Sequence, residues 1–168
     1  MDKIITDLAY IKAKALQREE ENARFRSYLK LNDLSSEEVD AIVRHILADV
    51  TSQIDCTKCG NCCEKIRPVL DDADIRTFAE GLAMPENLFR AQYLTYKKDS
   101  HTNFVFNTLP CPFLEDHKCV NYDSRPKDCR SYPHLHKEDF TGRLINVIFN
   151  YEICPIVFNV YERLKAAV

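Results

Sequence analysis

The stretch Cys56-Thr57-Lys58-Cys59-Gly60-Asn61-Cys62-Cys63 places four of the chain's eight cysteines within eight residues. Unbonded cysteines usually behave as small buried hydrophobes. Four so close together cannot all be core residues, because neighbouring side chains point in different directions. Two overlapping C-x-x-C pairs allow a loop to fold back so that several sulfurs reach one centre, and thiolates are soft ligands for zinc, copper(I) and iron–sulfur clusters. The stretch therefore predicts a metal or cluster site.

The remaining cysteines leave two kinds of metal site open. Cys111 and Cys154 each precede a proline, and a C-x2-C-x2-C triplet with a distant Cys-Pro is the pattern of bacterial ferredoxins. This spacing favours an iron–sulfur cluster. Zinc is the alternative, because a structural zinc ion takes four ligands, and Cys111 and Cys119 could flank a hairpin-like loop that supplies the second pair.

The adjacent pair Cys62-Cys63 bears on the number of metal centres. Neighbouring residues rarely direct both sulfurs at one mononuclear centre. Either one of the two is buried as a small apolar residue, or the site holds more than one metal. Eight thiolates exceed the four that one tetrahedral ion needs, so we expect a polynuclear cluster or two separate centres.

Composition and charge narrow the class of protein. The segment Met1 to Asp7 carries early acids and no apolar core, which is unlike a secretory signal, so we expect a reducing, cytoplasmic environment with metal-binding thiols. A disulfide framework is the alternative, and the apolar fraction of 45%, enough for a real core, argues against it. A net charge of −3 with scattered basic residues predicts no nucleic acid partner. No apolar run approaches the roughly 20 residues of a membrane span.

The first 50 residues are predicted to be helical. Apolar positions recur every three or four residues from Ile4 to Leu29, interrupted by Arg18 and Asn22, which predicts one long helix. The stripe suits a helix that packs on its own domain. A homodimer through a coiled coil within residues 1–50 is the alternative.

Beyond this helix, caps and breakers predict a mainly helical α+β fold. Ser35 and Glu38 form a capping box, Asp71 or Asp72 can cap a later helix, and Gly81 suits the C′ position that ends it. Residues 103–107 and 144–151 alternate in polarity and predict strands of a small antiparallel element. We expect further helices over residues 35–51, 72–81, 85–96 and from Pro155 onward, with an N-terminal helical extension at residues 1–53 packed on a cysteine-cluster domain at 54–168.

Three segments resemble the CxxCxxCC family of zinc- or iron-chelating domains, also called YkgJ-like proteins. The resemblance covers about residues 54–155, and Asn121 departs from it where the family more often has an aliphatic residue. The segments are Cys56-x2-Cys59-Gly60-Asn61-Cys62-Cys63, then Cys111-Pro112-Phe113-Leu114 with Cys119, then Tyr122-x2-Arg125-Pro126-x2-Cys129-Arg130-Ser131-Tyr132-Pro133.

The resemblance implies that all eight cysteines are candidate metal ligands, namely Cys56, Cys59, Cys62, Cys63, Cys111, Cys119, Cys129 and Cys154. Together with the spacing, it predicts a cytoplasmic protein that holds an iron–sulfur cluster of the [4Fe-4S] type, or Zn2+, for electron transfer or as a structural site. Arg125 and Arg130 bracket Cys129 and either form salt bridges or loop packing, or offset thiolate charge.

Two other functions follow from the same features. Longer relatives of the family resemble flagellin lysine N-methylases, which implies a protein-lysine N-methylase-like enzyme. The three isolated glycines, however, form no G-x-G-x-x-G loop for a nucleotide or S-adenosylmethionine, and no catalytic residue follows from the sequence. The third function is a zinc-stabilised interaction module that binds an unknown protein partner through residues 1–50.

Overall fold

The structure is a computed structural model that describes residues 3–168. It divides into two compact units. Unit 1 comprises Met1–Asp55 and Pro133–Val168, and unit 2 comprises Cys56–Tyr132. The break at residue 55 lies near the predicted boundary, but the C-terminal segment joins the N-terminal helices instead of the cysteine segment. The mainly helical α+β class is confirmed.

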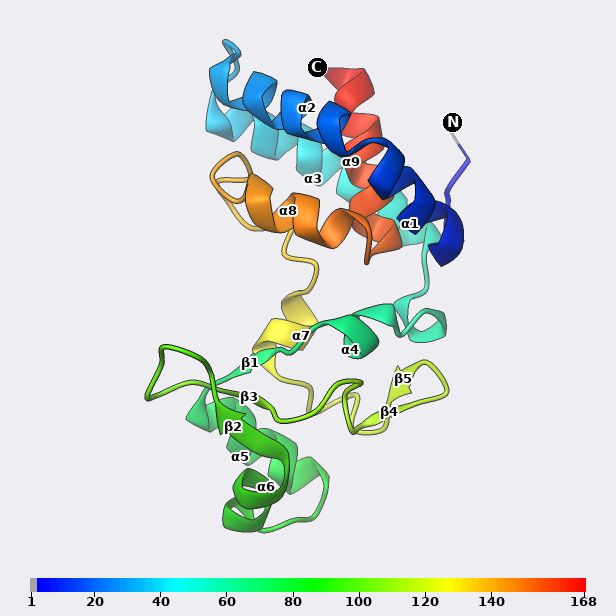
Figure 1. Ribbon diagram of the computed structural model, residues 1–168. Coiled ribbons are helices and arrows are strands. Elements are labelled where there is room, and N and C mark those ends of the chain that lie inside the picture. The colour runs from blue at the N-terminus through cyan, green and yellow to red at the C-terminus, as the bar shows by residue number, and fades with distance from the viewer. Residues whose placement is uncertain (1–2) are drawn as a thin grey trace. The chain divides into compact units, whose positions relative to one another are not determined.

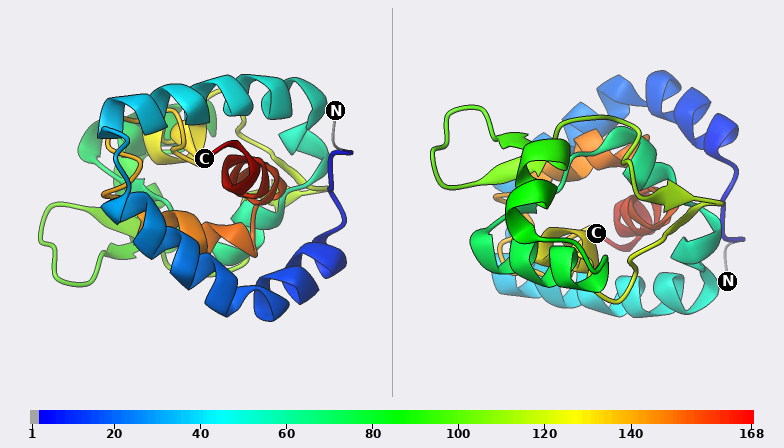
Figure 2. Two further views of the ribbon diagram at one scale, coloured as in Figure 1. Left: turned by 90° about the horizontal axis from the view of Figure 1, so that it is seen from above. Right: turned by 90° about the horizontal axis from the view of Figure 1, so that it is seen from below.

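Unit 1 is built round helix α9 (Pro155–Ala167). Eight of its 13 residues are buried, so this helix buries most of its circumference instead of a single stripe. Figure 1 shows the surrounding helices, and Figure 2 shows α9 end-on between α3 and the α1–α2 pair. They are α1 (Leu8–Gln17), α2 (Glu19–Leu31), α3 (Ser36–Gln53) and α8 (Leu144–Tyr151).

The predicted long N-terminal helix is two helices, because the chain leaves helical geometry at Arg18 (φ −105°, ψ 15°). The Arg18 guanidinium pairs with Glu162 of α9. The apolar stripe nevertheless runs on across the break, since Ile11 and Leu29 are both almost fully buried. The stripe thus packs within its own unit. A homodimer through residues 1–50 stays a prediction.

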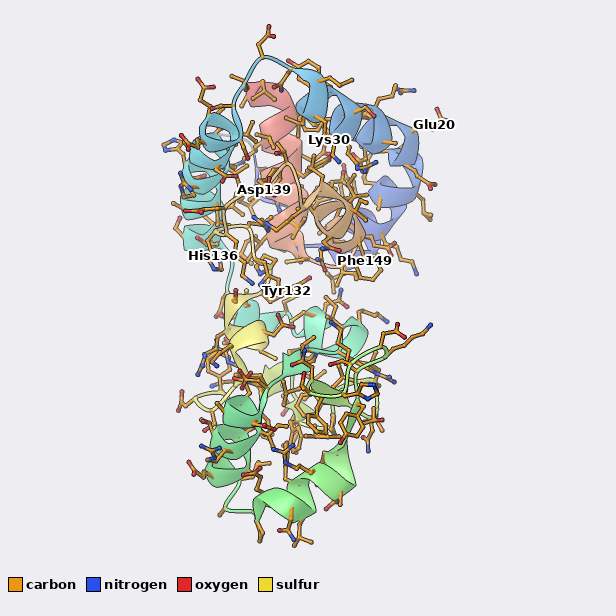
Figure 3. The ribbon with its side chains drawn as sticks, turned by 90° about the vertical axis from the view of Figure 1, so that its left-hand side faces the viewer. Glu20, Lys30, Tyr132, His136, Asp139 and Phe149 are labelled. Atoms are coloured by element: carbon orange, nitrogen blue, oxygen red, sulfur yellow. The ribbon has the colours of Figure 1, made fainter. Side chains whose placement is uncertain are left out.

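The prediction of a strand over residues 144–151 is wrong, because the segment is helix α8. Leu144, Val147 and Tyr151 are buried at helical spacing, whereas Ile145 and Phe149 are 65% and 60% exposed. Figure 3 shows Phe149 on the outside of this helix. The residues of this segment fit both the two-residue repeat of a strand and the repeat of a helix. Packing against α9 favours the helix.

A buried carboxylate fixes the loop that leads into α8. Asp40 of α3 is 6% exposed, and it accepts hydrogen bonds from the backbone N–H groups of Asp139 and Phe140, both at 2.9 Å. Asp139 lies in the loop before α8 (Figure 3). Because a buried charge is costly unless it is hydrogen-bonded, this loop is held firmly to α3.

Unit 2 contains short elements joined by long loops. Strand β3 is the centre of an antiparallel sheet with order β1-β3-β2, and β4 and β5 form a separate hairpin. Helices α5 and α6 pack on each other and on β1 and β2 respectively. The elements are η1 (Cys56–Lys58), α4 (Asn61–Lys65), β1 (Val69–Leu70), α5 (Asp72–Gly81), α6 (Glu86–Tyr93), β2 (Leu94–Tyr96), β3 (Phe104–Phe106), β4 (Leu114–Glu115), β5 (Lys118–Cys119) and α7 (Lys127–Ser131).

The core of unit 2 is largely aromatic. Phe113 is 6% exposed, and its ring centroid lies 4.8 Å from those of both Phe78 and Tyr93. Phe106 and Phe89 complete the group at 5.5 and 6.0 Å. Such ring pairs each contribute about 0.5–1.5 kcal/mol beyond the burial of their area.

The two ends of α5 differ in how they agree with the sequence prediction. Asp71, one of the two predicted caps, caps the helix, and it does so in a capping box with Asp74. Gly81, however, is the last residue of the helix and not a left-handed C′ residue. A Cβ there would lie 2.3 Å from Ser124 Oγ and 2.4 Å from Asn121 Oδ1. Gly81 is therefore required by close packing, and Asn121 serves that packing by donating to the carbonyl of Phe78 at 2.8 Å.

The helix expected over residues 85–96 ends three residues early, because Leu94–Tyr96 pairs with β3. Among the described residues, no single helix is long and apolar enough to cross a membrane. Only the pair α8 and α9, bent by 117°, passes that test by length and composition.

Candidate metal centre

The cysteine loop begins with the single turn η1 and continues into helix α4. Gly60 joins them with φ +63°, in the left-handed region that glycine enters without steric cost. A Cβ at Gly60 would lie 2.8 Å from both the Cα and the carbonyl oxygen of His117. The loop is thus in backbone contact with the β4–β5 hairpin, and any other residue at this position would clash there.

The segment between Cys111 and Cys119 forms the predicted hairpin. Leu114 pairs with Cys119, and the two turn residues Asp116 and His117 both have positive φ, as in a type I′ turn. The backbone N–H of Cys111 donates to the carbonyl of Cys63 at 2.8 Å. Two distant cysteine segments are therefore joined directly through their backbones.

Phe113 explains why the hairpin holds its position. It lies between Cys111 and Cys119 in the sequence and is buried in the aromatic core. Cys111 and Cys119 are partly buried and pack against that same core. Because one aromatic anchor fixes the segment, both sulfurs lie at the edge of one apolar cluster.

Helix α7 carries Cys129 and is anchored by two carboxylates. Asp128 Oδ2 accepts a hydrogen bond from the backbone N–H of Val69, and Asp74 Oδ1 accepts one from the N–H of Lys127, both at 2.9 Å. The sequence analysis did not single out Asp128. The sequence signal for its role was that Asp128 directly precedes Cys129 in the third family segment.

Four thiols affect one another electrostatically. A hydrogen bond from Cys62 and the charge of Arg125 lower the pKa of Cys63 to about 7, against the effect of burial. The pKa of Cys111 is raised to about 12, first by burial and then by the charges of Cys63 and Cys119, against a hydrogen bond from the Phe113 backbone that lowers it. Burial, followed by the charge of Cys63, also raises the pKa of Cys119 and of Cys129. A bound cation would relieve this mutual repulsion.

Arg125 is a cation whose charge acts on two of these thiols. Its guanidinium carbon lies 3.4 Å from the ring centroid of Tyr122, and its Nε donates to the Tyr122 carbonyl at 2.8 Å. Its charge lowers the pKa of both Cys63 and Cys119. Loop packing and charge compensation are therefore two roles of one side chain. Arg130 is exposed on α7.

The other four predicted ligands differ in burial. Cys56 is exposed, Cys59 and Cys62 are partly buried, and Cys154 is buried in unit 1 at the N-cap of α9. Within residues 3–168, no three His, Cys, Asp or Glu side chains are arranged so that they could hold a metal ion. The set of eight ligands stays a prediction.

The chain belongs to the CxxCxxCC family, whose sequence model, described as "Putative zinc- or iron-chelating domain", matches residues 55–145, more than half of the chain. Neither the curated proteins nor the solved structures include a significant match. The resemblance seen in the sequence is thus confirmed, together with the general chemistry of zinc or iron chelation.

The donor set fits such a metal. Zinc and iron–sulfur clusters prefer thiolate sulfur. The four thiols that interact electrostatically come from three segments, and the segment with Cys111 and Cys119 packs on the aromatic core. Deprotonating several of them together without a cation is unfavourable, since each thiolate raises the pKa of its neighbours. Metal binding supplies the missing positive charge and leaves the thiols deprotonated.

Proposed function

We propose that this protein binds an iron–sulfur cluster of the [4Fe-4S] type through its clustered thiolates, with Zn2+ as the competing occupant. The observation that supports this most is that three cysteine segments are connected within unit 2: the Cys111 N–H donates to the Cys63 carbonyl, the hairpin with Cys111 and Cys119 packs on the aromatic core, and α7 with Cys129 is hydrogen-bonded to β1. The C-x2-C-x2-C spacing of Cys56, Cys59 and Cys62, with a distant Cys-Pro, favours iron over zinc, and these three cysteines are candidate ligands beside the four above.

The physiological role that fits is electron transfer or structural support in the cytoplasm. A reducing compartment keeps thiols available as ligands. A structural role draws support from unit 2, whose strands are only two or three residues long and which would gain folding energy from the metal. Electron transfer would require the iron–sulfur form, whose reduction potential depends on hydrogen bonds to sulfur and on solvent exposure.

Anaerobic purification followed by iron, zinc and acid-labile sulfide analysis tests the proposal. Iron and sulfide in comparable amounts, with a visible charge-transfer band, would support the cluster and permit a redox titration. Zinc without sulfide would assign the structural alternative. A chain in which serine replaces Cys63, Cys111, Cys119 and Cys129 is the control for adventitious metal. Equal metal content in that control and the natural chain would refute the proposal.

A further inference from the structure

A cleft of about 270 Å³ lies in unit 1, between the N-terminal segment, helix α1 and one face of helix α9. Its lining residues all fall within positions 3–18 and 158–163, whereas the family model matches residues 55–145. The cleft therefore lies outside the region to which zinc or iron chelation is assigned. Its volume is slightly below the roughly 300–1,000 Å³ of most small-molecule sites, which limits an occupant to a small molecule.

A buried amide holds one wall of the cleft in place. Asn159 of α9 is 5% exposed. Its Oδ1 accepts a hydrogen bond from the Ile5 N–H at 2.9 Å, and its Nδ2 donates to the Ile5 carbonyl at 2.7 Å. The same Nδ2 also donates to the carbonyl of Pro155 at 2.7 Å. Because the amide is bonded to both α9 and Ile5, the segment before α1 is fixed against α9, and this wall is formed before any ligand binds.

Two aromatic rings give the cleft an apolar part. The rings of Tyr10 and Phe158 pack edge to face, with their centroids 6.4 Å apart. Phe158 is buried, whereas Tyr10 is exposed, and Ile5 adds an aliphatic side chain to the lining. A ligand with an aromatic or aliphatic group would remove this apolar surface from water, which is favourable.

Positive charge predominates among the charged side chains that line the cleft in the described part of the chain. They are Lys3, Arg18 and Arg163, against the carboxylate of Glu162. Arg18 pairs with Glu162, but a guanidinium carries five N–H donors, so one carboxylate does not satisfy all of them. Lys3 is exposed beside them in the N-terminal segment.

The ion pairs that extend from these side chains do not reverse the sign. Arg163 pairs with Asp49 of α3, and Glu21 of α2 lies 3.9 Å from Arg18 and 2.6 Å from Lys165. Within residues 3–168, the resulting set of four cations and three carboxylates is Lys3, Arg18, Arg163, Lys165, Glu21, Asp49 and Glu162. One positive charge is in excess within this set, which favours an anion in the cleft.

We propose that this cleft binds a small organic anion, a carboxylate or a phosphate ester that carries an aromatic or aliphatic group. The apolar group packs against Tyr10 and Phe158, and the anionic group pairs with Arg18 and Lys3. A guanidinium suits both kinds of anion, because its N–H groups bind carboxylate and phosphate oxygens in a bidentate manner. The inference goes beyond the proposed metal binding and does not depend on it.

Two-dimensional NMR of the isotope-labelled full chain, titrated with phenylacetate and with phenyl phosphate, tests the proposal. Benzyl alcohol supplies the ring without the charge, and inorganic phosphate supplies the charge without the ring. We expect saturable shifts of amides in residues 3–18 and 158–163 with at least one aromatic anion, and weaker binding of both controls. The tighter of the two anions distinguishes a carboxylate from a phosphate ester. No saturable binding of either anion, or equal binding of either control, would overturn the inference.

Two tyrosines of similar exposure provide a matched pair of variants. Tyr10 is 45% exposed and lines the cleft, whereas Tyr28 of α2 is 49% exposed and lies outside its lining. Tyr10→Ala should weaken binding of the aromatic anion about tenfold, since an aromatic contact contributes up to about that factor, and Tyr28→Ala should leave it unchanged. Equal affinities of the two variants would contradict the assignment.

A second pair of variants tests the charge without altering the apolar wall. Lys3→Gln should weaken binding by up to about fivefold, whereas Lys12→Gln removes an equal charge from an exposed position of α1 outside the lining and should have no effect. Circular dichroism checks that all four variants keep the helices of unit 1. Equal losses for Lys3→Gln and Lys12→Gln would show that the anion responds only to overall charge and would overturn the inference.

Discussion

The two units solve the problem of stability differently. Unit 1 surrounds α9 with four helices and buries aliphatic and aromatic side chains along nearly its whole length. Unit 2 has two strands of three residues, three of two, and one aromatic cluster. Two of its cysteines, Cys111 and Cys119, pack at the edge of that cluster. Unit 2 thus has a small hydrophobic core and long loops that position its cysteines. In such a unit, metal binding can supply folding free energy that the small core does not.

Metal removal should separate the units most clearly. Chelation under reducing conditions should cost unit 2 on the order of 10 kcal/mol, as for structural zinc, and leave unit 1 folded. Hydrogen exchange should then rise across residues 56–132 and stay slow in α9. Uniform loss of protection in both units would break the comparison.

Truncation of the aromatic anchor should come next in size. Phe113→Ala should cost about 3–5 kcal/mol, because Phe113 contacts several rings of the core. Metal affinity should fall with it, since the hairpin carries two of the proposed ligands. Denaturant unfolding and Zn2+ titration measure the two effects.

The control for Phe113 is Val120→Ala in the same segment, at a side chain that is 51% exposed. This variant should stay within about 0.5 kcal/mol of the natural chain. A similar loss for both substitutions would show that the aromatic core does not position the hairpin.

The contact between the cysteine loop and the hairpin should depend on Gly60. Gly60→Ala places a Cβ against the His117 backbone and requires φ +63° of an L-residue, so we expect a loss of about 1–3 kcal/mol. Ala83→Gly is the control with opposite sign, since Ala83 itself has φ 52° and should gain or stay neutral. Thermal unfolding measures both variants. A Gly60→Ala variant as stable as the natural chain would show that this contact does not constrain the loop.

The smallest effect concerns the cap of α5. The hydrogen bond from the Asp74 N–H, and then that from Lys127, lower the pKa of Asp71 in the folded protein. The ionised cap therefore stabilises the protein above the ordinary carboxyl pKa of about 3.9, and this contribution is lost as the pH falls through the lower folded value. Asp71→Ala should cost about 1 kcal/mol at pH 7.

Asp71→Asn keeps the cap and removes the charge, so it should cost less than Asp71→Ala and abolish the pH dependence that this carboxylate contributes. Urea unfolding at several pH values measures the difference. If Asp71→Ala lowered the free energy of unfolding by the same amount below the folded pKa of Asp71 as at pH 7, the charge of this carboxylate would play no part. In unit 1 the uncharged cap Ser35 of α3 provides a comparison whose own side chain does not titrate.

Several features could be predicted from local sequence because local chemistry decides them. The capping box at Ser35 appears as expected, and Asp71, one of the two predicted caps, caps α5, since a side chain and a backbone N–H three residues apart need no distant partner. The hairpin closed by Cys119 and the proline start of α9 follow the same logic. The cysteine signature likewise identified the family.

Other features needed tertiary contacts. Alternation in residues 144–151 fits a strand, yet burial against α9 makes it a helix. The stripe from Ile4 to Leu29 continues across a break at Arg18, where an ion pair with Glu162 accompanies the change of direction. Neither partner is near in sequence, so no local pattern could reveal the outcome.

By itself, the sequence determined the chemistry of this protein, because thiolate donors at C-x-x-C spacing are specified by residue identity alone. Only the tertiary structure decided which cysteine segments are joined to one another. Cys63 meets Cys111 through a backbone hydrogen bond, and Phe113 and Asp128 fix the segments that carry the others. Grouping depends on distances across folded loops, and these are set by packing and buried hydrogen bonds between residues far apart in the chain.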